Sequence, residues 1–351
     1  MTRSLQSGTP QTRRSLQAPS PEVHPLSLQD GADIRLTRYR GGDRGPVMLV
    51  HCIGVSSRMY SLDTIDTNLV EYLVAAGFDV WLLDFRFSID LPASSLPASF
   101  DMVAELDYPA AVGTVLRNTG RDSLQVVAHG IGSQTFSMAM LLGLQGVRSA
   151  VCSQVAVHLH APRLSRFKAA LRMPTLLRRV GLDTLTTSPS NPGVADWLMD
   201  ASLRLHPVEA RCASRTCRRV TAFYGPLYQH DRLNPPTHDA LPALFGHFNL
   251  RAFAHLGRNL NRGHLVREDG ADVYRPQLDR LAIPVTFLHG LDNRCLLPES
   301  TRETFDALGE RNGRSLYRWH GIAGYGHVDC MIGERAVSDV YPLILDHLEN
   351  F

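Results

Sequence analysis

Residues 124–132, with the sequence LQVVAHGIG, decide the fold of this chain. The apolar run at 124–128 is typical of a strand that is buried on both faces of a sheet. A short turn then leads into residues 133–144, which have the pattern of a helix. The central residue of the turn is Gly130, and the small residues Ala128 and Gly132 flank it. The segment therefore predicts a buried strand, a sharp turn and a helix.

The same alternation of strand and helix extends along the chain in both directions. Residues 34–40 have the alternation of a strand, and further strand patterns occur at 47–50, 78–83, 147–155, 283–289 and 315–319. Helical patterns occur between them at 67–76 and 102–116, and a last helical pattern covers 336–349. Such alternation predicts an α/β protein with a mostly parallel sheet and helices on both faces.

Three regions differ in composition and predict the domain organisation. Residues 1–28 are rich in Ser, Thr, Gln and Pro, and we expect a disordered tail there. Residues 29–157 and 282–351 carry the alternating pattern of the core. Residues 158–281 show helical patches without a clear buried strand, and we expect an inserted helical cap.

Three short segments at the ends of expected strands carry residues with catalytic chemistry. The turn at 128–132 resembles the G-x-S-x-G nucleophile elbow, but its centre is Gly130, which has no nucleophilic side chain. Asp292 follows a late strand and is the expected acid, with its neighbour Asn293 as the less favoured choice. His327 lies in a glycine-rich loop before the last helix and is the expected base. The order elbow, acid, histidine is that of the α/β-hydrolase fold, which we predict for this chain, with an inserted helical cap.

Two backbone amides complete the expected site. Ile53 follows the strand at 47–50, and Ile131 follows the elbow, so their N–H groups are the candidates for an oxyanion hole. Cys52 stands where a glycine is usual after the preceding histidine. Two interpretations of Cys52 stay open: it is a small apolar filler, or it is a thiol relocated close to the missing nucleophile.

The chain also resembles a narrower family, the α/β-hydrolases fused to or encoded with GMC-type oxidoreductases of the cholesterol-oxidase kind. The matching segments lie at residues 65–69 (IDTNL), 79–84 (DVWLLD), 143–151 (GLQGVRSAV), 224–230 (YGPLYQH), 233–234 (LN), 237–241 (THDAL) and 325–330 (YGHVDC). The resemblance covers nearly all of the chain from residue 45 onward. It implies an elbow that more often carries Cys than Ser, so Gly130 is a departure, and it implies apolar steroid-like or polyketide-like ester substrates.

The expected cap contains a short polar stretch that could reach the site. Its candidate substrate contacts are Tyr228, His230, Asn234 and His238, and His129 in the elbow is a further candidate. Apolar cap helices would enclose a pocket for a hydrophobic small molecule.

Composition excludes several other classes of function. The net charge is +2, which gives no one-signed field for nucleic-acid binding, and no apolar run is long enough to span a bilayer. The six cysteines form no CxxC pair. Cys212 and Cys217 are fairly close, but without a further Cys or His nearby at ligand spacing a metal site is disfavoured, so we expect neither a metal nor another cofactor. Free thiols and the absence of a secretory signal favour a cytoplasmic protein, and the oligomeric state stays open.

Three functions remain open from the sequence. The favoured one is general-base chemistry by a His327–Asp292 pair on a hydrophobic molecule without a covalent nucleophile, such as cyclisation, elimination, isomerisation or C–C cleavage. The second is an esterase or thioesterase that uses activated water or the relocated Cys52, or one whose nucleophile was replaced by an introduced glycine. The third is a pseudo-hydrolase that binds a ligand without turnover.

Overall fold

The computed structural model describes residues 14–163, 165, 173–179, 181–187, 193–205, 212 and 214–351. Its centre is an eight-stranded sheet with the strand order β1-β2-β4-β3-β5-β6-β9-β10. The strands are β1 (Glu22–Ser27), β2 (Asp33–Tyr39), β3 (Pro46–Val50), β4 (Asp79–Asp84), β5 (Leu124–His129), β6 (Val147–Ser153), β9 (Val285–Gly290) and β10 (Tyr317–Ile322). From β4 to β10 all neighbours run parallel, while β1 and β2 are antiparallel to their neighbours. The mostly parallel sheet predicted from the sequence is confirmed.

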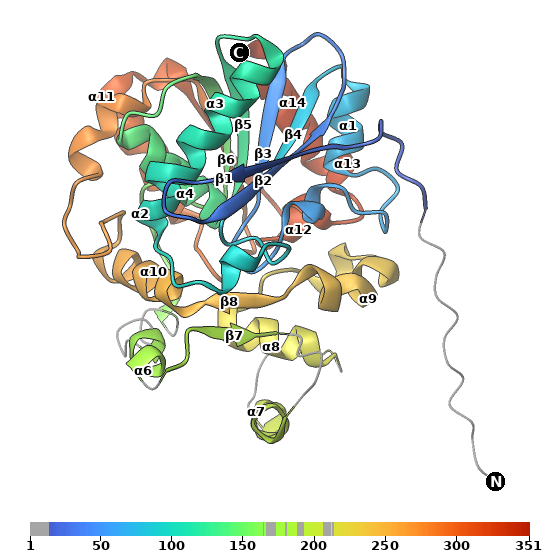
Figure 1. The fold of residues 1–351 in the computed structure, drawn as a ribbon, viewed down its shortest axis with the longest axis vertical. Coiled ribbons are helices and arrows are strands. Elements are labelled where there is room, and N and C mark those ends of the chain that lie inside the picture. Colours follow the sequence, from blue (N-terminus) through green and yellow to red (C-terminus); the bar gives the residue numbers. More distant parts are fainter. Residues whose placement is uncertain are drawn as a thin grey trace.

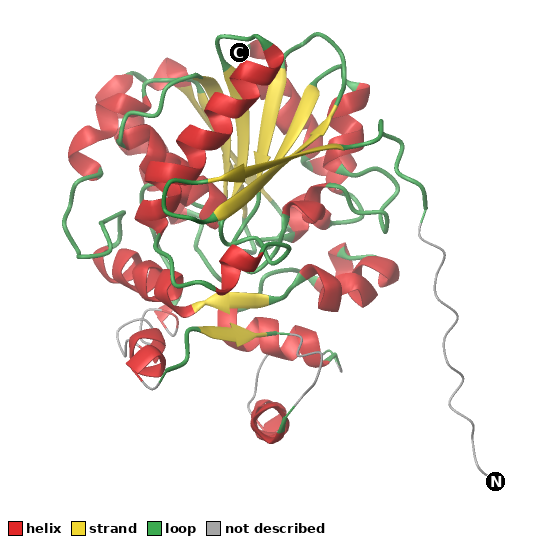
Figure 2. Cartoon of the chain, in the orientation of Figure 1, coloured by secondary structure: helices red, strands yellow, loops and turns green. Residues whose placement is uncertain are grey.

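Helices cover both faces of this sheet (Figures 1 and 2). One apolar core includes side chains of α3 (Tyr108–Thr119), α4 (Ile131–Leu141) and α11 (Glu299–Asn312). A second core includes side chains of α1 (Leu69–Ala75), α12 (Asp329–Ile332), α13 (Ala336–Asp339) and α14 (Tyr341–Asn350). The central strands β3, β4 and β5 are buried along their whole length, as their mostly apolar sequences predict. Shorter helical segments of the core include α2 (Phe100–Met102) and the π-helical turn Val103–Asp107.

The segment between β6 and β9 forms a cap at one end of the sheet (Figure 1). It contains α6 (Met173–Arg179), α7 (Val194–Leu205), α8 (Arg215–Tyr224), α9 (Pro235–Leu244) and α10 (Leu250–Arg262). Two short antiparallel strands, β7 (Thr184–Thr186) and β8 (His247–Asn249), pair within it. Asparagine, a preferred N-cap residue, precedes both α9 and α10. Asn234 and Asn249 accept hydrogen bonds from the first-turn amides of these helices and so fix where they begin.

The N-terminal segment departs from the sequence prediction of a disordered tail up to residue 28. Glu22–Ser27 forms β1 and pairs with β2 at the edge of the sheet, where Pro25 is tolerated. Arg14 donates to the buried carboxylate of Glu71 at 2.6 Å. The prediction is therefore wrong for residues 14–28, and residues 1–13 lie outside the described part of the chain. Within the described residues, no helix combines the length and the hydropathy needed to cross a bilayer.

Candidate functional site

The elbow has the backbone geometry that the sequence predicts. Gly130 connects β5 to α4 with φ 55° and ψ −126°, a conformation that an L side chain adopts only under strain. A Cβ at Gly132 would lie 2.4 Å from the carbonyl oxygen of His51, which explains why that flank must be glycine. Strained turns of this type hold a side chain at the carboxyl edge of the sheet in the nucleophile-elbow motif.

The space beside Gly130 is filled by the thiol of Cys52. A Cβ placed on Gly130 would lie 2.5 Å from Sγ of Cys52 and 2.9 Å from Nε2 of His327. A serine or cysteine could therefore not enter position 130 while Cys52 keeps its place. Gly130 and Cys52 fit each other, which is unexpected if the glycine had been introduced into a complete serine or cysteine enzyme.

Cys52 faces both the histidine and the expected oxyanion amides. Its Sγ lies 4.0 Å from Nε2 of His327 and accepts the N–H of Ile131 at 3.4 Å. Burial raises the pKa of the Cys52 thiol to about 11, against the opposing effect of hydrogen bonds from the Ile131 and Ile53 amides. The thiol is therefore protonated at neutral pH, and the two expected amides converge on it.

His327 is held by Asn293 and not by Asp292. The Nδ1 atom of His327 lies 3.0 Å from Nδ2 of Asn293, and both residues are buried. Asp292 is exposed, and its backbone N–H donates to the carbonyl of Tyr325 at 2.9 Å. The assignment of Asp292 as the acid beside His327 is wrong, because the turn after β9 directs the next side chain inward. The geometry therefore does not support general-base chemistry by a pair of His327 and Asp292.

The hydrogen bonds of Asn293 define which way its amide points. Its Oδ1 accepts the backbone N–H groups of Cys295 and Leu296 at 2.9 and 3.2 Å. Its Nδ2 lies 2.9 Å from Oε1 of Gln154. Nδ2 must therefore donate to Nδ1 of His327, and the imidazole carries its proton on Nε2. Burial, followed by the nearby His129 and His289, holds the pKa of His327 well below its usual range, so the ring is neutral.

Gln154 is a site residue that the sequence analysis missed. It follows β6 with φ 74°, an unusual conformation for a residue other than glycine, and its Oε1 also accepts the N–H of Gly290 at 3.2 Å. The available signal was its place after a buried strand, at the sheet edge where ligands bind in open α/β folds.

The cap contributes directly to the position of His327. The carbonyl of Leu227 accepts the N–H groups of His327 and Val328 at 2.9 and 2.8 Å. Oδ2 of Asp329 accepts the N–H groups of Gly326 and Gln229 at 2.9 and 3.2 Å. Burial raises the pKa of Asp329 to about 6. The histidine loop and residues 227–229 of the cap are thus joined by main-chain hydrogen bonds to Leu227 and by the side-chain carboxylate of Asp329.

A cavity of about 1250 Å³ lies between the cap and the elbow. Its lining includes Cys52, Ile131 and His327 on the core side, and Tyr224, Leu250 and Phe253 on the cap side. The cavity is large enough for a drug-sized or lipid-like molecule.

The other candidate substrate contacts have different roles, and the described part of the cavity lining includes none of them. His129 is buried beneath His327 with its Nδ1 3.2 Å from the Ser153 hydroxyl, and burial lowers its pKa to about 3. Asn234 caps α9 and donates to the carbonyl of Thr64 at 2.7 Å. Tyr228, His230 and His238 lie instead around two cysteine thiols. The sequence analysis was wrong to treat Cys212 and Cys217 as remote from any histidine.

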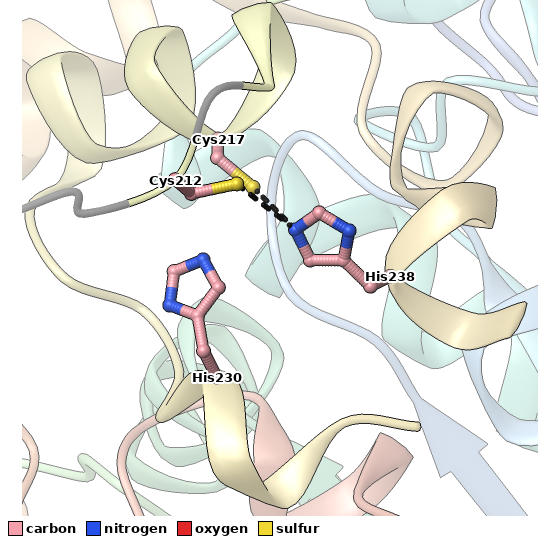
Figure 3. A group of neighbouring side chains, drawn as sticks. All are labelled: Cys212, Cys217, His230 and His238. Carbon is pink, nitrogen blue, oxygen red and sulfur yellow. Dashed lines mark hydrogen bonds between the residues drawn. The ribbon is translucent and has the colours of Figure 1, made fainter. Parts of the chain in front are cut away.

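The cysteine and histidine group is compact. One ligand atom from each of Cys212, Cys217, His230 and His238 lies within 4.8 Å of every other (Figure 3). Tyr228 donates its hydroxyl to Sγ of Cys217 at 3.0 Å.

Comparison with known proteins identifies the fold. No family model matches the chain. Bovine gastric triacylglycerol lipase (Bos taurus) is 30% identical over 131 residues, which cover 32% of this chain and 32% of that protein. Human lysosomal acid lipase/cholesteryl ester hydrolase (Homo sapiens) is 27% identical over 129 residues, with the same coverage of both chains. The match thus spans about a third of the length of these curated relatives.

Solved structures extend the similarity over nearly the whole chain. A hydrolase from Pseudomonas aeruginosa has a TM-score of 0.58 at 14% identity, covering 93% of this chain and 98% of the other. The monoacylglycerol lipase of Paleococcus ferrophilus has a TM-score of 0.55 at 17% identity, covering 92% and 100%. A thioesterase domain from the curacin biosynthetic pathway has a TM-score of 0.52 at 16% identity, covering 93% and 99%. The predicted α/β-hydrolase fold is confirmed.

Proposed function

We propose that this protein hydrolyses esters or thioesters of hydrophobic carboxylic acids, with Cys52 as the nucleophile. The observation that carries the proposal is the position of the Cys52 thiol. Its Sγ occupies the volume that a side chain on Gly130 would enter, and it lies 4.0 Å from Nε2 of His327. Cysteine and glycine have exchanged the two positions in which a nucleophile and a small residue are expected.

In the proposed acyl-transfer reaction each of these groups has a role. Cys52 would attack the carbonyl carbon and pass its proton to His327, which would return a proton to the leaving alcohol or thiol. The N–H groups of Ile53 and Ile131 would stabilise the oxyanion. Water would then release the acid from the thioester on Cys52. Asn293 would hold the imidazole in place, but through its Nδ2 donor, whereas the amide of a Cys-His-Asn triad accepts the histidine N–H.

The resting tautomer of His327 limits this chemistry. Removal of the thiol proton requires a lone pair on Nε2, whereas the donation from Asn293 places the proton there. The Nδ1–H tautomer would face the Nδ2 donor of Asn293, and turning that amide would cost the hydrogen bonds from Cys295 and Leu296. We therefore expect a slow hydrolase that favours substrates with good leaving groups.

The proposed substrate class rests on the cavity and on the names of the relatives. A largely apolar cavity of about 1250 Å³ suits a long acyl chain or a fused-ring alcohol better than a small polar ester. The curated relatives act on triacylglycerols and cholesteryl esters according to their names. The resemblance to GMC-associated hydrolases implies steroid-like or polyketide-like esters, and a cytoplasmic location remains part of the proposal.

The direct test compares variants of two thiols that line the same cavity. Hydrolysis of 4-nitrophenyl esters of increasing acyl length would be measured for Cys52→Ala and Cys295→Ala. We expect kcat/KM to fall roughly 10²–10⁴-fold in Cys52→Ala, as on loss of a nucleophile, and to change little in Cys295→Ala. Full activity in a folded Cys52→Ala protein would contradict the proposal.

A second candidate is ligand binding without turnover. The hydrogen bond from Asn293 favours it, because an Nε2–H group is a donor to a bound carbonyl or hydroxyl and not a base. This alternative predicts no hydrolysis by the wild-type chain and unchanged binding of a hydrophobic ligand in Cys52→Ala.

A further inference from the structure

Four side chains in the cap converge on one point outside the catalytic cavity. Cys212 precedes α8, Cys217 lies in its first turn, His230 begins the 3₁₀ turn His230–Arg232, and His238 lies on α9. Figure 3 shows the two thiols and the two rings pointing toward one another. Nε2 of His238 lies 3.3 Å from Sγ of Cys212 and 3.1 Å from Sγ of Cys217.

These separations are close to the edges of a small coordination tetrahedron, and the shorter one lies about 0.2 Å below them. Zinc–sulfur bonds of about 2.3 Å and zinc–nitrogen bonds of about 2.0–2.1 Å imply ligand atoms about 3.3–3.8 Å apart. The four ligand atoms of the cluster lie within 4.8 Å of one another, so small side-chain movements would place all four around one ion. Two thiolates and two imidazoles are the donor set of structural zinc sites.

The spacing along the chain agrees with this interpretation. Four residues separate Cys212 from Cys217, twelve separate Cys217 from His230, and seven separate His230 from His238. A close cysteine pair followed after about a dozen residues by a histidine pair is typical of Cys₂His₂ sites, although this histidine spacing is longer than usual.

The surroundings contain groups that support metal-bound ligands. The hydroxyl of Tyr228 donates to Sγ of Cys217 at 3.0 Å, and the N–H of Ser214 donates to Sγ of Cys212 at 3.4 Å. Both bonds would stabilise a thiolate. Nδ1 of His238 lies 3.8 Å from a carboxylate oxygen of the exposed Asp239, which is beyond hydrogen-bond distance.

We propose that Cys212, Cys217, His230 and His238 bind one zinc ion in a closed, structural site of the cap. Four protein ligands leave no open position for substrate, so the ion would act on stability and not on the reacting bond. The ion would join the start of α8 to α9. It would also fix the residues just after Leu227, whose carbonyl holds the backbone of His327.

Metal analysis of the full-length chain is the first test. The protein would be purified under reducing conditions, depleted with a chelator and titrated with zinc or cobalt chloride. We expect saturation at one ion per chain, the visible absorption of tetrahedral cobalt–thiolate coordination, and protection of Cys212 and Cys217 from alkylation. Saturation without thiol protection would overturn the proposal. So would a disulfide between these two cysteines that persists after purification under reducing conditions.

Variants separate this cluster from other histidines and thiols. Cys217→Ser and His238→Gln are expected to lose the cobalt spectrum. The controls, His320→Gln on β10 and Cys295→Ser in the cavity lining, lie outside the cluster and are expected to retain it. Circular dichroism would show whether each variant is folded. If a cluster variant does not fold, the titration and alkylation of the wild-type chain decide the question alone. Retention of an equimolar ion with the same spectrum in both cluster variants would refute the assignment.

Discussion

Replacement of Asn293 by aspartate is expected to make this protein a faster hydrolase. One carboxylate oxygen can keep the bonds from the N–H groups of Cys295 and Leu296, now at 2.9 and 3.2 Å. The other oxygen would replace Nδ2, which lies 3.0 Å from Nδ1 of His327. An acceptor at that point moves the imidazole proton to Nδ1 and leaves a lone pair on Nε2, facing Cys52.

The size of the effect follows from the cost of the wrong tautomer. In a serine protease triad, the opposite change from acid to amide lowers kcat about 10⁴-fold through the histidine tautomer. The gain in kcat from Asn293→Asp should be smaller than this factor. The new carboxylate would face Oε1 of Gln154, which accepts from Nδ2 of Asn293 at 2.9 Å in the wild-type chain. We expect kcat to rise about 10²–10³-fold and the free energy of unfolding to fall by about 1–3 kcal/mol.

The assay is steady-state hydrolysis of a 4-nitrophenyl ester, with urea unfolding to measure stability. The matched control is Asp292→Asn, which changes the exposed neighbouring carboxylate and is expected to leave kcat unchanged. A folded Asn293→Asp protein with equal or lower kcat would refute the role assigned to His327. A large loss in Asp292→Asn would restore Asp292 as the acid.

Three further predictions concern the same site. Gly130→Cys alone should lower the free energy of unfolding by about 2–5 kcal/mol, because the backbone is strained and the new side chain collides with Cys52. Adding Cys52→Gly should remove the collision and restore that part of the free energy of unfolding. Equal urea midpoints for the single and double variants would contradict this expectation. The active form has a neutral thiol and a neutral imidazole, and the pKa of His327 is well below 6.5. In a pH series kcat/KM should therefore stay flat as the pH falls from about 7 to 5.5. A fall in kcat/KM with an apparent pKa near 6.5 would contradict a neutral His327 over this range. Burial lowers the pKa of His129 from 6.5 to about 3, so its contribution to stability is present above pH 6.5 and is lost toward pH 3, at about 1.4 kcal/mol per pH unit. Urea unfolding at pH 7 and 5 should therefore show a smaller loss for His129→Gln than for the wild-type chain, and an equal loss would show that His129 is not the group responsible.

The fold could be predicted because its signals are local. A strand buried on both faces leaves an uninterrupted apolar run, and a turn into a helix leaves small residues around Gly130. Each of these patterns can be recognised within about ten residues. Strand β1 was missed because its alternation is weak and contains Pro25, a residue that only an edge strand accepts.

The site was harder to predict, because it depends on side-chain direction within a turn. Asp292 and Asn293 are neighbours, and only the three-dimensional turn after β9 shows that the amide points inward while the carboxylate is exposed. The preference for an acid over an amide came from chemistry and not from geometry. Gln154 was missed for the same reason, since its role appears only when β6 and β9 lie side by side.

The cysteine and histidine cluster illustrates a further limit of sequence patterns. His230 and His238 were assigned to the cavity because cap residues commonly reach substrate. Their actual neighbours are set by how α8 and α9 pack, which no periodicity in the sequence specifies.

The central claim is that Cys52 forms a covalent bond with the acyl group. Incubation with an activated ester, rapid acid quenching and peptide mass mapping would locate the acyl group directly. We expect one acyl group on the peptide containing Cys52, accumulating within the first turnover. The same peptide of Cys52→Ala is expected to carry none. Steady hydrolysis by the wild-type chain with no acyl group on Cys52 at any quench time would contradict the account.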